Sequence, residues 1–178
     1  ITHWGMSGPA ILKLSAFGAR TLADLKYCFE LQVNWIGDSS QELSKQLQEK
    51  RKQAANKLVT KLKLAPLPNR LWQSLVKAAQ ISETARYGDL SKQQQQQLVK
   101  ELCAGSYAIN GKSTFKEEFV TAGGVNLKEI NFKTFESKLH PNLFFAGEVL
   151  DIDAVTGGFN FQAAWTGGYL AALGMVEG

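Results

Sequence analysis

A long stretch with a helical pattern, residues 40–104, lies between two segments whose patterns are those of strands and turns. Its first part has apolar residues at the spacing of one helical face, and this spacing predicts a helix that continues as far as Pro66. A loop of this length without secondary structure would be uncommon inside a compact domain. The stretch therefore predicts an inserted helical lobe in a mixed α+β fold. The residues that carry the first helical face are Leu43, Leu47, Ala54, Leu58 and Leu62.

Further helices are expected after Pro66 and Pro68, because proline ends a helix and helix start and stop signals follow it. A run of five glutamines lies in the last of these helices and is interpreted as an exposed helix face. The signals are the spacing of Leu71, Leu75 and Ala79, then Ser82 and Gly88 at the ends of a short piece, then Ser91 and Gly105 at the ends of the last helix.

The segments on either side of the helical stretch have strand and turn signals. Residues 27–35 alternate between apolar and polar side chains, which is typical of a half-buried antiparallel strand. Before this strand, Ser7 is a candidate N-cap and Pro9 fits the first turn of a helix that we expect to end at Gly18. After the helical stretch we expect strands at residues 115–121, 127–132 and 143–146, then a helix at about 160–173.

The net charge of +4 is unevenly distributed, because residues 41–63 hold seven basic side chains and two acids. A basic segment can attract nucleic acid or an acidic partner. Here it falls on a helical pattern with few aromatic residues, so a solvated helix face is favoured and nucleic acid is an unlikely partner. No segment has the ~20 apolar residues of a membrane span, so we expect no membrane partner.

The few cysteines and histidines exclude several kinds of site. Cys28 and Cys103 match no metal or redox spacing and are interpreted as buried free thiols in a reducing cytoplasm. With His3 and His140 the only histidines, a histidine-rich metal centre cannot be built, and no metal is expected.

The C-terminal part of the chain carries the strongest functional signal. A short apolar segment is followed by Gly147-Glu148, Asp151 and the glycine pair Gly157-Gly158, which precedes the last helix. Glycines let the backbone approach a ligand, and a helix N-terminus favours negative charge. The pattern fits a cofactor cradle, although a turn that packs a helix on a strand explains it equally well.

Polar residues around these glycines are candidate ligand contacts. Asn160 could cap the helix or bond a ring amide. Glu148 and Asp151 could accept hydrogen bonds from ribityl or ribose hydroxyls, or they could equally be ordinary acids of a turn. A second glycine pair, Gly123-Gly124, falls at the end of an expected strand, where α/β folds bind ligands, although a plain turn is sufficient to explain it.

The segment that begins at His3 reads as a tight turn before a helix or as a loop placed against a ligand. In the second interpretation His3 is a polar contact or proton donor. The sequence has no Gly-x-Gly-x-x-Gly and no Walker-type loop, so the usual pyrophosphate-binding strand and helix are absent from it.

Taken together, the motifs resemble the YhiN/BaiN-type NAD(P)/FAD-dependent oxidoreductases. The resemblance covers most of the chain and is weakest in the helical stretch. It implies a split two-dinucleotide-binding FAD domain that is interrupted by a β-barrel-like lobe with an inserted helical lobe. The matching segments are 2–10 (THWGMSGPA), 120–125 (VTAGGV), 134–138 (TFESK), 145–151 (FAGEVLD) and 157–163 (GGFNFQA).

The resemblance also implies boundaries and roles. Residues 1–39 would end the β-rich lobe, 40–104 would be the helical lobe, 105–122 the return strand, and 123–178 the C-terminal segment of the FAD-binding domain. It would place Gly123 and Gly124 near the cofactor, and Gly147, Glu148 and Asp151 at the ribityl–pyrophosphate region. It would place Gly157, Gly158, Asn160 and Phe161 at the isoalloxazine end.

By this resemblance the chain is the C-terminal fragment of a cytoplasmic flavoprotein. The parent would pass hydride from NAD(P)H to FAD and then to a small organic acceptor. The fragment lacks the N-terminal dinucleotide-binding segment, so its FAD site would be incomplete and the fragment inactive alone. Two alternatives stay open: a basic helical module that binds nucleic acid or an acidic partner, and a structural fragment without activity.

Overall fold

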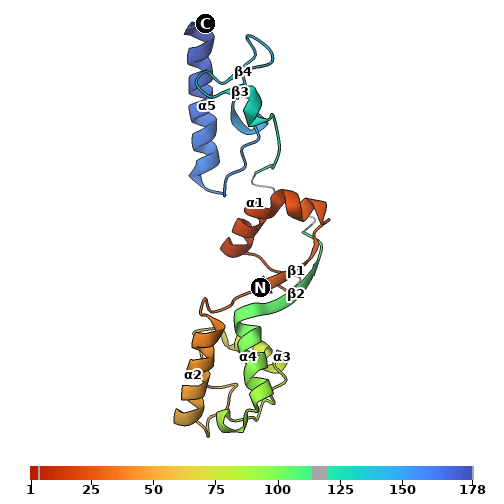
Figure 1. The fold of residues 1–178 in the computed structure, drawn as a ribbon, viewed down its shortest axis with the longest axis vertical. Coiled ribbons are helices and arrows are strands. Elements are labelled where there is room, and N and C mark those ends of the chain that lie inside the picture. The colour runs from red at the N-terminus through yellow and green to blue at the C-terminus, as the bar shows by residue number, and fades with distance from the viewer. Residues whose placement is uncertain (4, 114–119, 178) are drawn as a thin grey trace. The chain divides into compact units, whose positions relative to one another are not determined.

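The structure is a computed structural model that describes residues 1–3, 5–113 and 120–177. The chain divides into two compact units. One unit is Phe29–Ile109, and the other combines Ile1–Cys28 with Asn110–Gly178. Figure 1 labels the helices and strands of both units. Helices and short two-stranded sheets together make a mixed α/β architecture, as the sequence predicts.

The unit Phe29–Ile109, called the helical unit here, packs α2 (Ser40–Gln53) and α3 (Asn69–Ala78) against α4 (Lys92–Ala104). Strand β1 (Cys28–Val33) pairs with β2 (Gly105–Asn110) beside these helices. The alternation predicted for residues 27–35 is confirmed, because Phe29, Leu31 and Val33 are half-buried between exposed neighbours. The core is formed by apolar side chains of all three helices, among them Leu43, Leu47, Trp72, Leu75, Leu98 and Leu102.

Two capping boxes begin α2 and α4. The Ser39 hydroxyl and backbone N–H donate to the Glu42 carboxylate and lower its pKa below the ordinary value, while Ser39 Oγ accepts from the Glu42 N–H. Ser91 Oγ accepts from the Gln94 N–H at 3.1 Å, and Gln94 Oε1 accepts from the Ser91 N–H at 3.1 Å. The predicted N-cap at Ser91 is confirmed.

Replacing Ser91 with alanine should lower the free energy of unfolding of the helical unit by about 1 kcal/mol, because a backbone N–H at the start of α4 loses its acceptor. Urea unfolding followed by circular dichroism measures the change. Ser74→Ala is the matched control, since Ser74 is exposed on α3 and makes no hydrogen bond among the described residues. An equal effect of both substitutions would contradict the capping role.

The first predicted helix of this unit is wrong in its second half. Helix α2 ends at Gln53 instead of continuing to Pro66, and residues 54–68 form a loop. Leu58 makes an antiparallel bridge with Arg86, and the Val59 N–H donates to the Ala85 carbonyl at 3.0 Å. This long-range pairing replaces helical hydrogen bonds at Leu58 and buries Val59 completely. The short piece expected from Ser82 to Gly88 is only the 3-10 helix η1 (Tyr87–Asp89).

In the other unit the helix α5 (Gly158–Glu177) packs on a short hairpin formed by β3 (Ile130–Asn131) and β4 (Glu136–Ser137). The core is Ile130, Phe135, Leu150 and Ala171. Glycines of α5 make this contact possible: a Cβ on Gly167 would lie 2.7 Å from Phe135 Cε1. The small residues of α5 thus let the helix pack closely on the hairpin.

Several local predictions in this unit are wrong. Helix α1 (Pro9–Asp24) has Gly8 rather than Ser7 at its N-cap and passes through Gly18. The strand expected at 127–132 is reduced to β3, after the 3-10 helix η2 (Leu127–Glu129), and the one at 143–146 to a single bridge at Phe144. The strand at 115–121 lies largely outside the described residues.

Two other expectations concern the cysteines and the membrane. Both cysteines are free, as expected, but Cys28 is exposed and Cys103 only partly buried, so the interpretation as buried thiols is wrong. Among the described residues, no helix combines the length and the apolar character that crossing a membrane requires.

Candidate functional site

The two glycine-bearing turns that the sequence marked lie against each other. The Val125 N–H donates to the Val149 carbonyl at 2.8 Å, and the Asp151 N–H donates to the Val125 carbonyl at 3.1 Å. These bonds form a parallel bridge between Val125 and Leu150. Gly124 has φ +145°, and a Cβ there would lie 2.5 Å from the Val149 carbonyl oxygen. Only glycine lets the two backbones approach this closely.

Gly147 connects this pair of turns to α5. It has φ +80° and begins the 3-10 helix η3 (Gly147–Val149), which contacts α5. A Cβ on Gly147 would lie 4.0 Å from the Ala164 Cβ, so the backbone passes close to the second turn of the helix. The Gly124 turn therefore contacts the segment that contains η3, and η3 lies beside the first turns of α5.

The N-terminal end of α5 is open. Gly157 has φ +138°, and a Cβ on Gly157 or on Gly158 would meet no atom within 4 Å among the described residues. The first turn of the helix has no acidic side chain, so the positive end of its dipole is not neutralised from within the helix. This end is suited to an electron-rich group, and the glycines leave space for one.

Asn160 holds the loop that leads into α5. Its Oδ1 accepts from the Ala154 N–H at 2.9 Å, and its Nδ2 donates to the Ala154 carbonyl at 2.9 Å. Both ends of the amide are therefore engaged with the protein backbone. Asn160 thus has a loop-holding role close to capping, while the contact with a ring amide stays a prediction, because the second N–H and the second oxygen lone pair of the amide are not used in these bonds.

Two carboxylates stand near the turns in different environments. Glu148 is exposed in η3, where it can accept a hydrogen bond from a ligand hydroxyl. Asp151 is partly buried and forms an ion pair with Arg20 of α1, whose side chain is 64% exposed. Because that pair is solvent-exposed on one side, it orients Asp151 more than it stabilises the fold.

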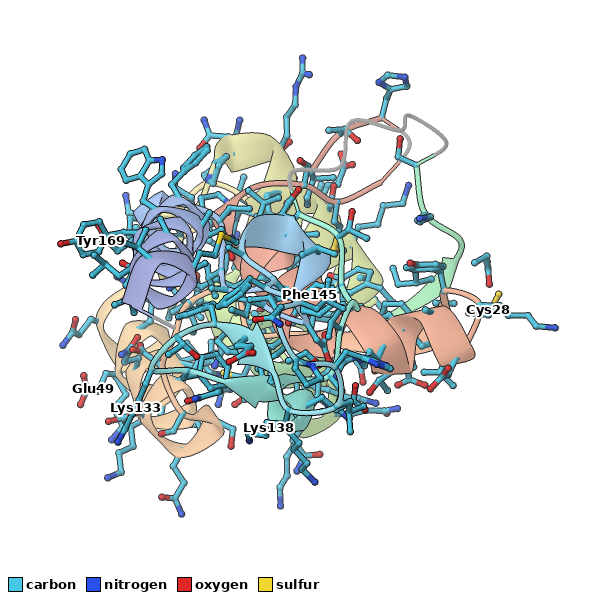
Figure 2. All side chains as sticks on the ribbon, turned by 90° about the horizontal axis from the view of Figure 1, so that it is seen from above. Cys28, Glu49, Lys133, Lys138, Phe145 and Tyr169 are labelled. Carbon is cyan, nitrogen blue, oxygen red and sulfur yellow. The ribbon has the colours of Figure 1, made fainter. Side chains whose placement is uncertain are left out.

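Phe161 belongs to an aromatic face of α5. Its ring stacks on Trp165 at 6.1 Å, and Tyr169 follows one turn later. All three side chains are about two-thirds exposed, and Figure 2 shows Tyr169 projecting away from the helix. The opposite face of α5 is also apolar and packs on the hairpin. A helix that is apolar all round is normally enclosed in a larger core.

His3 lies in an exposed loop before α1. Thr2 and Gly5 close a tight turn around it through bonds of 2.8–3.1 Å. A proton-donor role for His3 stays a prediction. Across the described residues, no group of three or more His, Cys, Asp and Glu side chains could hold a metal ion.

Sequence reasoning missed three participants in this arrangement: Arg20, Ala154 and Ala164. Arg20 lies in α1, far along the chain from Asp151, and an exposed arginine gives no local signal of its partner. Ala154 takes part only through its backbone. Ala164 belongs to the small-residue pattern of α5, which predicts close packing but not against which segment.

Residues 1–120 match the family model described as the HI0933-like protein barrel and H2TH domain. The chain belongs to the HI0933-like family. Proteins similar to this HI0933-like chain include the ribosomal RNA dihydrouridine synthase of Escherichia coli K12, which is 30% identical over 175 residues, and that of Haemophilus influenzae, 31% over 172 residues. The 3-dehydro-bile acid delta(4,6)-reductase of Clostridium scindens is 25% identical over 178 residues.

The alignments cover 97–99% of this HI0933-like chain but only 40–43% of each relative. The chain therefore spans about two-fifths of the length of the curated relatives it matches. Residues 123–178, which hold most of the candidate site, lie beyond the family model but within all three alignments, because each covers almost the whole chain.

Proposed function

We propose that the chain is the flavin-completing, C-terminal part of a YhiN/BaiN-type FAD-dependent oxidoreductase. The observation that supports this most is the contact between the Gly124 turn and segment 147–151, beside the open N-terminus of α5. The open backbone at Gly157 and Gly158 fits a flat, electron-rich group, because a Cβ would occupy empty space there and no acid in the first turn opposes negative charge.

Each part of the site has a proposed task. The first N–H groups of α5 would stabilise negative charge on a bound flavin, as helix N-termini do. Glu148 accepts hydrogen bonds from ribityl hydroxyls, while Asp151 is kept in place by Arg20. Asn160 fixes the loop that leads to Gly157. Bound FAD would supply hydride transfer from NAD(P)H to an organic acceptor.

The names of the relatives suggest the class of acceptor. A dihydrouridine synthase saturates a carbon–carbon double bond of uridine in RNA, and a delta(4,6)-reductase saturates a double bond of a 3-dehydro-bile acid. In both molecules a carbonyl is conjugated with the double bond. We propose the same reaction class here, in which hydride adds to one carbon and a proton to the other. His3 is the candidate source of that proton.

The site is proposed to be shared with a preceding segment that binds the dinucleotide. Helix α5 offers an aromatic face of Phe161, Trp165 and Tyr169 that nothing among the described residues covers. Burying such side chains contributes about 1.5–3 kcal/mol each, so a partner segment would gain considerable stability from covering them. We therefore expect the isolated chain to be inactive and to bind FAD weakly.

Flavin retention tests the proposal. The longer protein of this proposal consists of the preceding dinucleotide-binding segment and this chain. It should retain FAD through gel filtration, seen as the flavin absorbance spectrum, whereas the 178-residue chain should lose most of the FAD. In the longer protein Gly157→Val should reduce retention at least tenfold, because a side chain would fill the open space at the start of α5. The matched control is Gly111→Val, since Gly111 has a similarly positive φ of +152° and an equally open surrounding. Equal retention by both variants, or no flavin in the longer protein, would refute the site.

A further inference from the structure

Most of the positive charge of this protein lies in the helical unit. Residues 29–109 hold twelve Lys and Arg side chains against seven Asp and Glu, which is a charge of +5 on a chain whose total is +4. Within this unit, residues 50–63 contain six basic side chains and no acid. We call this segment, which covers the end of α2 and the loop after it, the basic loop.

The basic loop is ordered although most of it has no regular secondary structure. The Trp72 indole N–H donates to the Val59 carbonyl at 2.8 Å, and the Tyr87 hydroxyl donates to the Leu62 carbonyl at 2.5 Å. Trp72 and Tyr87 are both fully buried. Two core side chains thus add to the bridge between Leu58 and Arg86 in holding this loop in place. Loops of this length on a rigid scaffold commonly carry function.

Three cations of the basic loop have structural tasks. Arg51 Nε donates to the Tyr87 carbonyl at 3.2 Å, and Lys63 Nζ donates to the Leu67 carbonyl at 2.6 Å. Lys50 is partly buried at the end of α2, where cations stabilise a helix C-terminus. These three residues therefore need no further explanation.

The other three cations, Lys52, Lys57 and Lys61, are exposed and have no ion pair or hydrogen bond among the described residues. Lys57 and Lys61 lie on consecutive turns of the loop, because the Lys57 backbone N–H donates to the Ala54 carbonyl at 2.9 Å and the Lys61 backbone N–H to the Leu58 carbonyl at 3.2 Å. Lys52 lies in the last turn of α2, just before them. Arg86, bridged to Leu58, adds a fourth exposed cation, whose Nη1 also donates to the Asn56 carbonyl at 2.6 Å. Three acids belong to the segments that contact these cations. Glu49 lies in α2, the Glu83 carbonyl accepts from Thr60 Oγ1 at 3.2 Å, and the Asp89 N–H donates to the Arg86 carbonyl at 3.1 Å.

We propose that the exposed cations of the basic loop, Lys52, Lys57 and Lys61, together with Arg86, bind the phosphate backbone of an RNA substrate. This rests on the proposed function, since RNA as the acceptor enters through the relatives named ribosomal RNA dihydrouridine synthases. The surface itself favours a polyanion. Throughout residues 29–109, all of which are described, no large apolar side chain is exposed, so an apolar anchor for a protein or membrane surface is lacking.

The test uses the whole 178-residue chain and a fluorescein-labelled RNA hairpin, with binding followed by fluorescence anisotropy between about 50 and 200 mM KCl. Lys52→Gln/Lys57→Gln/Lys61→Gln should weaken binding at least tenfold at low salt. It should also make the slope of log K against log salt less steep by about two to three, because three phosphate contacts are removed. The melting temperature should change little, since no hydrogen bond or ion pair is lost among the described residues and only Lys52 lies in the last turn of α2.

The matched control is Lys77→Gln/Lys92→Gln/Lys100→Gln. These lysines are exposed on α3 and α4 of the same unit, and the net charge changes equally. The control should keep most of the affinity and of the salt slope. Equal loss in both triple variants would overturn the proposal, because it would show attraction to net charge alone.

Two further results would also overturn the proposal. One is no RNA binding at about 50 mM salt. The other is equally tight binding to polyglutamate or to phosphatidylserine vesicles, which would indicate an acidic protein or a membrane surface instead. Flavin retention by the longer protein is measured separately. If RNA does not bind but the longer protein retains FAD, only the proposed RNA surface is refuted. If RNA binds but the longer protein retains no FAD, only the proposed flavin site is refuted.

Discussion

Replacing Trp72 with alanine should lower the free energy of unfolding of the helical unit by about 3–5 kcal/mol. Trp72 is fully buried at the centre of the core formed by α2, α3 and α4. Removing its ring leaves a cavity that the surrounding side chains fill only in part. Because small domains are stable by only about 5–15 kcal/mol, a loss of this size would remove a large part of the stability of the unit.

The same ring also holds the basic loop, through the hydrogen bond from its indole N–H to the Val59 carbonyl. Trp72→Phe separates the two contributions, because it keeps most of the packing and leaves that carbonyl without a donor. We expect it to cost about 1–3 kcal/mol. The amides of residues 54–63 should exchange with solvent faster in Trp72→Phe, even where the helices remain protected.

Urea unfolding combined with hydrogen exchange measures both variants, and hydrogen exchange distinguishes the two units of the chain. Trp165→Ala is the matched control, since Trp165 is 70% exposed on α5. Its effect should stay within about 1 kcal/mol, mostly from lost stacking on Phe161. If Trp72→Ala were as mild as this control, the arrangement of the helical core described here would be wrong.

Local signals in the sequence predicted the parts of the fold that depend on neighbouring residues. Ser91 as an N-cap and the alternation of residues 27–35 are examples, because a capping side chain and a strand face act within a few residues. Leu58 and Leu62 show the opposite case. Their helical spacing was real, but pairing of Leu58 with Arg86 and burial of Val59 outweighed helix propensity.

For the candidate site, the sequence identified glycines but not their geometry. Gly147 was marked because glycines let the backbone approach a ligand, and Gly124 because it falls at the end of an expected strand. That the Gly124 turn lies directly on Val149 follows from a parallel bridge between residues far apart in the chain. The ion pair of Asp151 with Arg20 and the engagement of Asn160 with Ala154 also depend on tertiary contacts. Such contacts leave no local pattern that could predict them.

Replacing Gly124 with alanine should destabilise the unit that contains α5 by roughly 2–5 kcal/mol. The added Cβ would lie 2.5 Å from the Val149 carbonyl oxygen and 2.7 Å from the Leu150 carbonyl carbon. Both are backbone atoms, so no side chain can turn away to make room. The bridge between Val125 and Leu150 would have to open, and segment 147–151 would move away from its place beside α5.

Gly123→Ala separates this clash from backbone strain. Gly123 also has a positive φ, +112°, but a Cβ there would meet no atom within 4 Å among the described residues. It should therefore cost only about 1–3 kcal/mol, the range for a strained backbone conformation. Urea unfolding and hydrogen exchange at residues 125 and 149–151 measure the difference between the variants. In the longer protein, Gly124→Ala should also lose FAD while Gly123→Ala retains part of it. Equal stability of the two variants would show that the close contact of Gly124 with Val149 does not hold the site together.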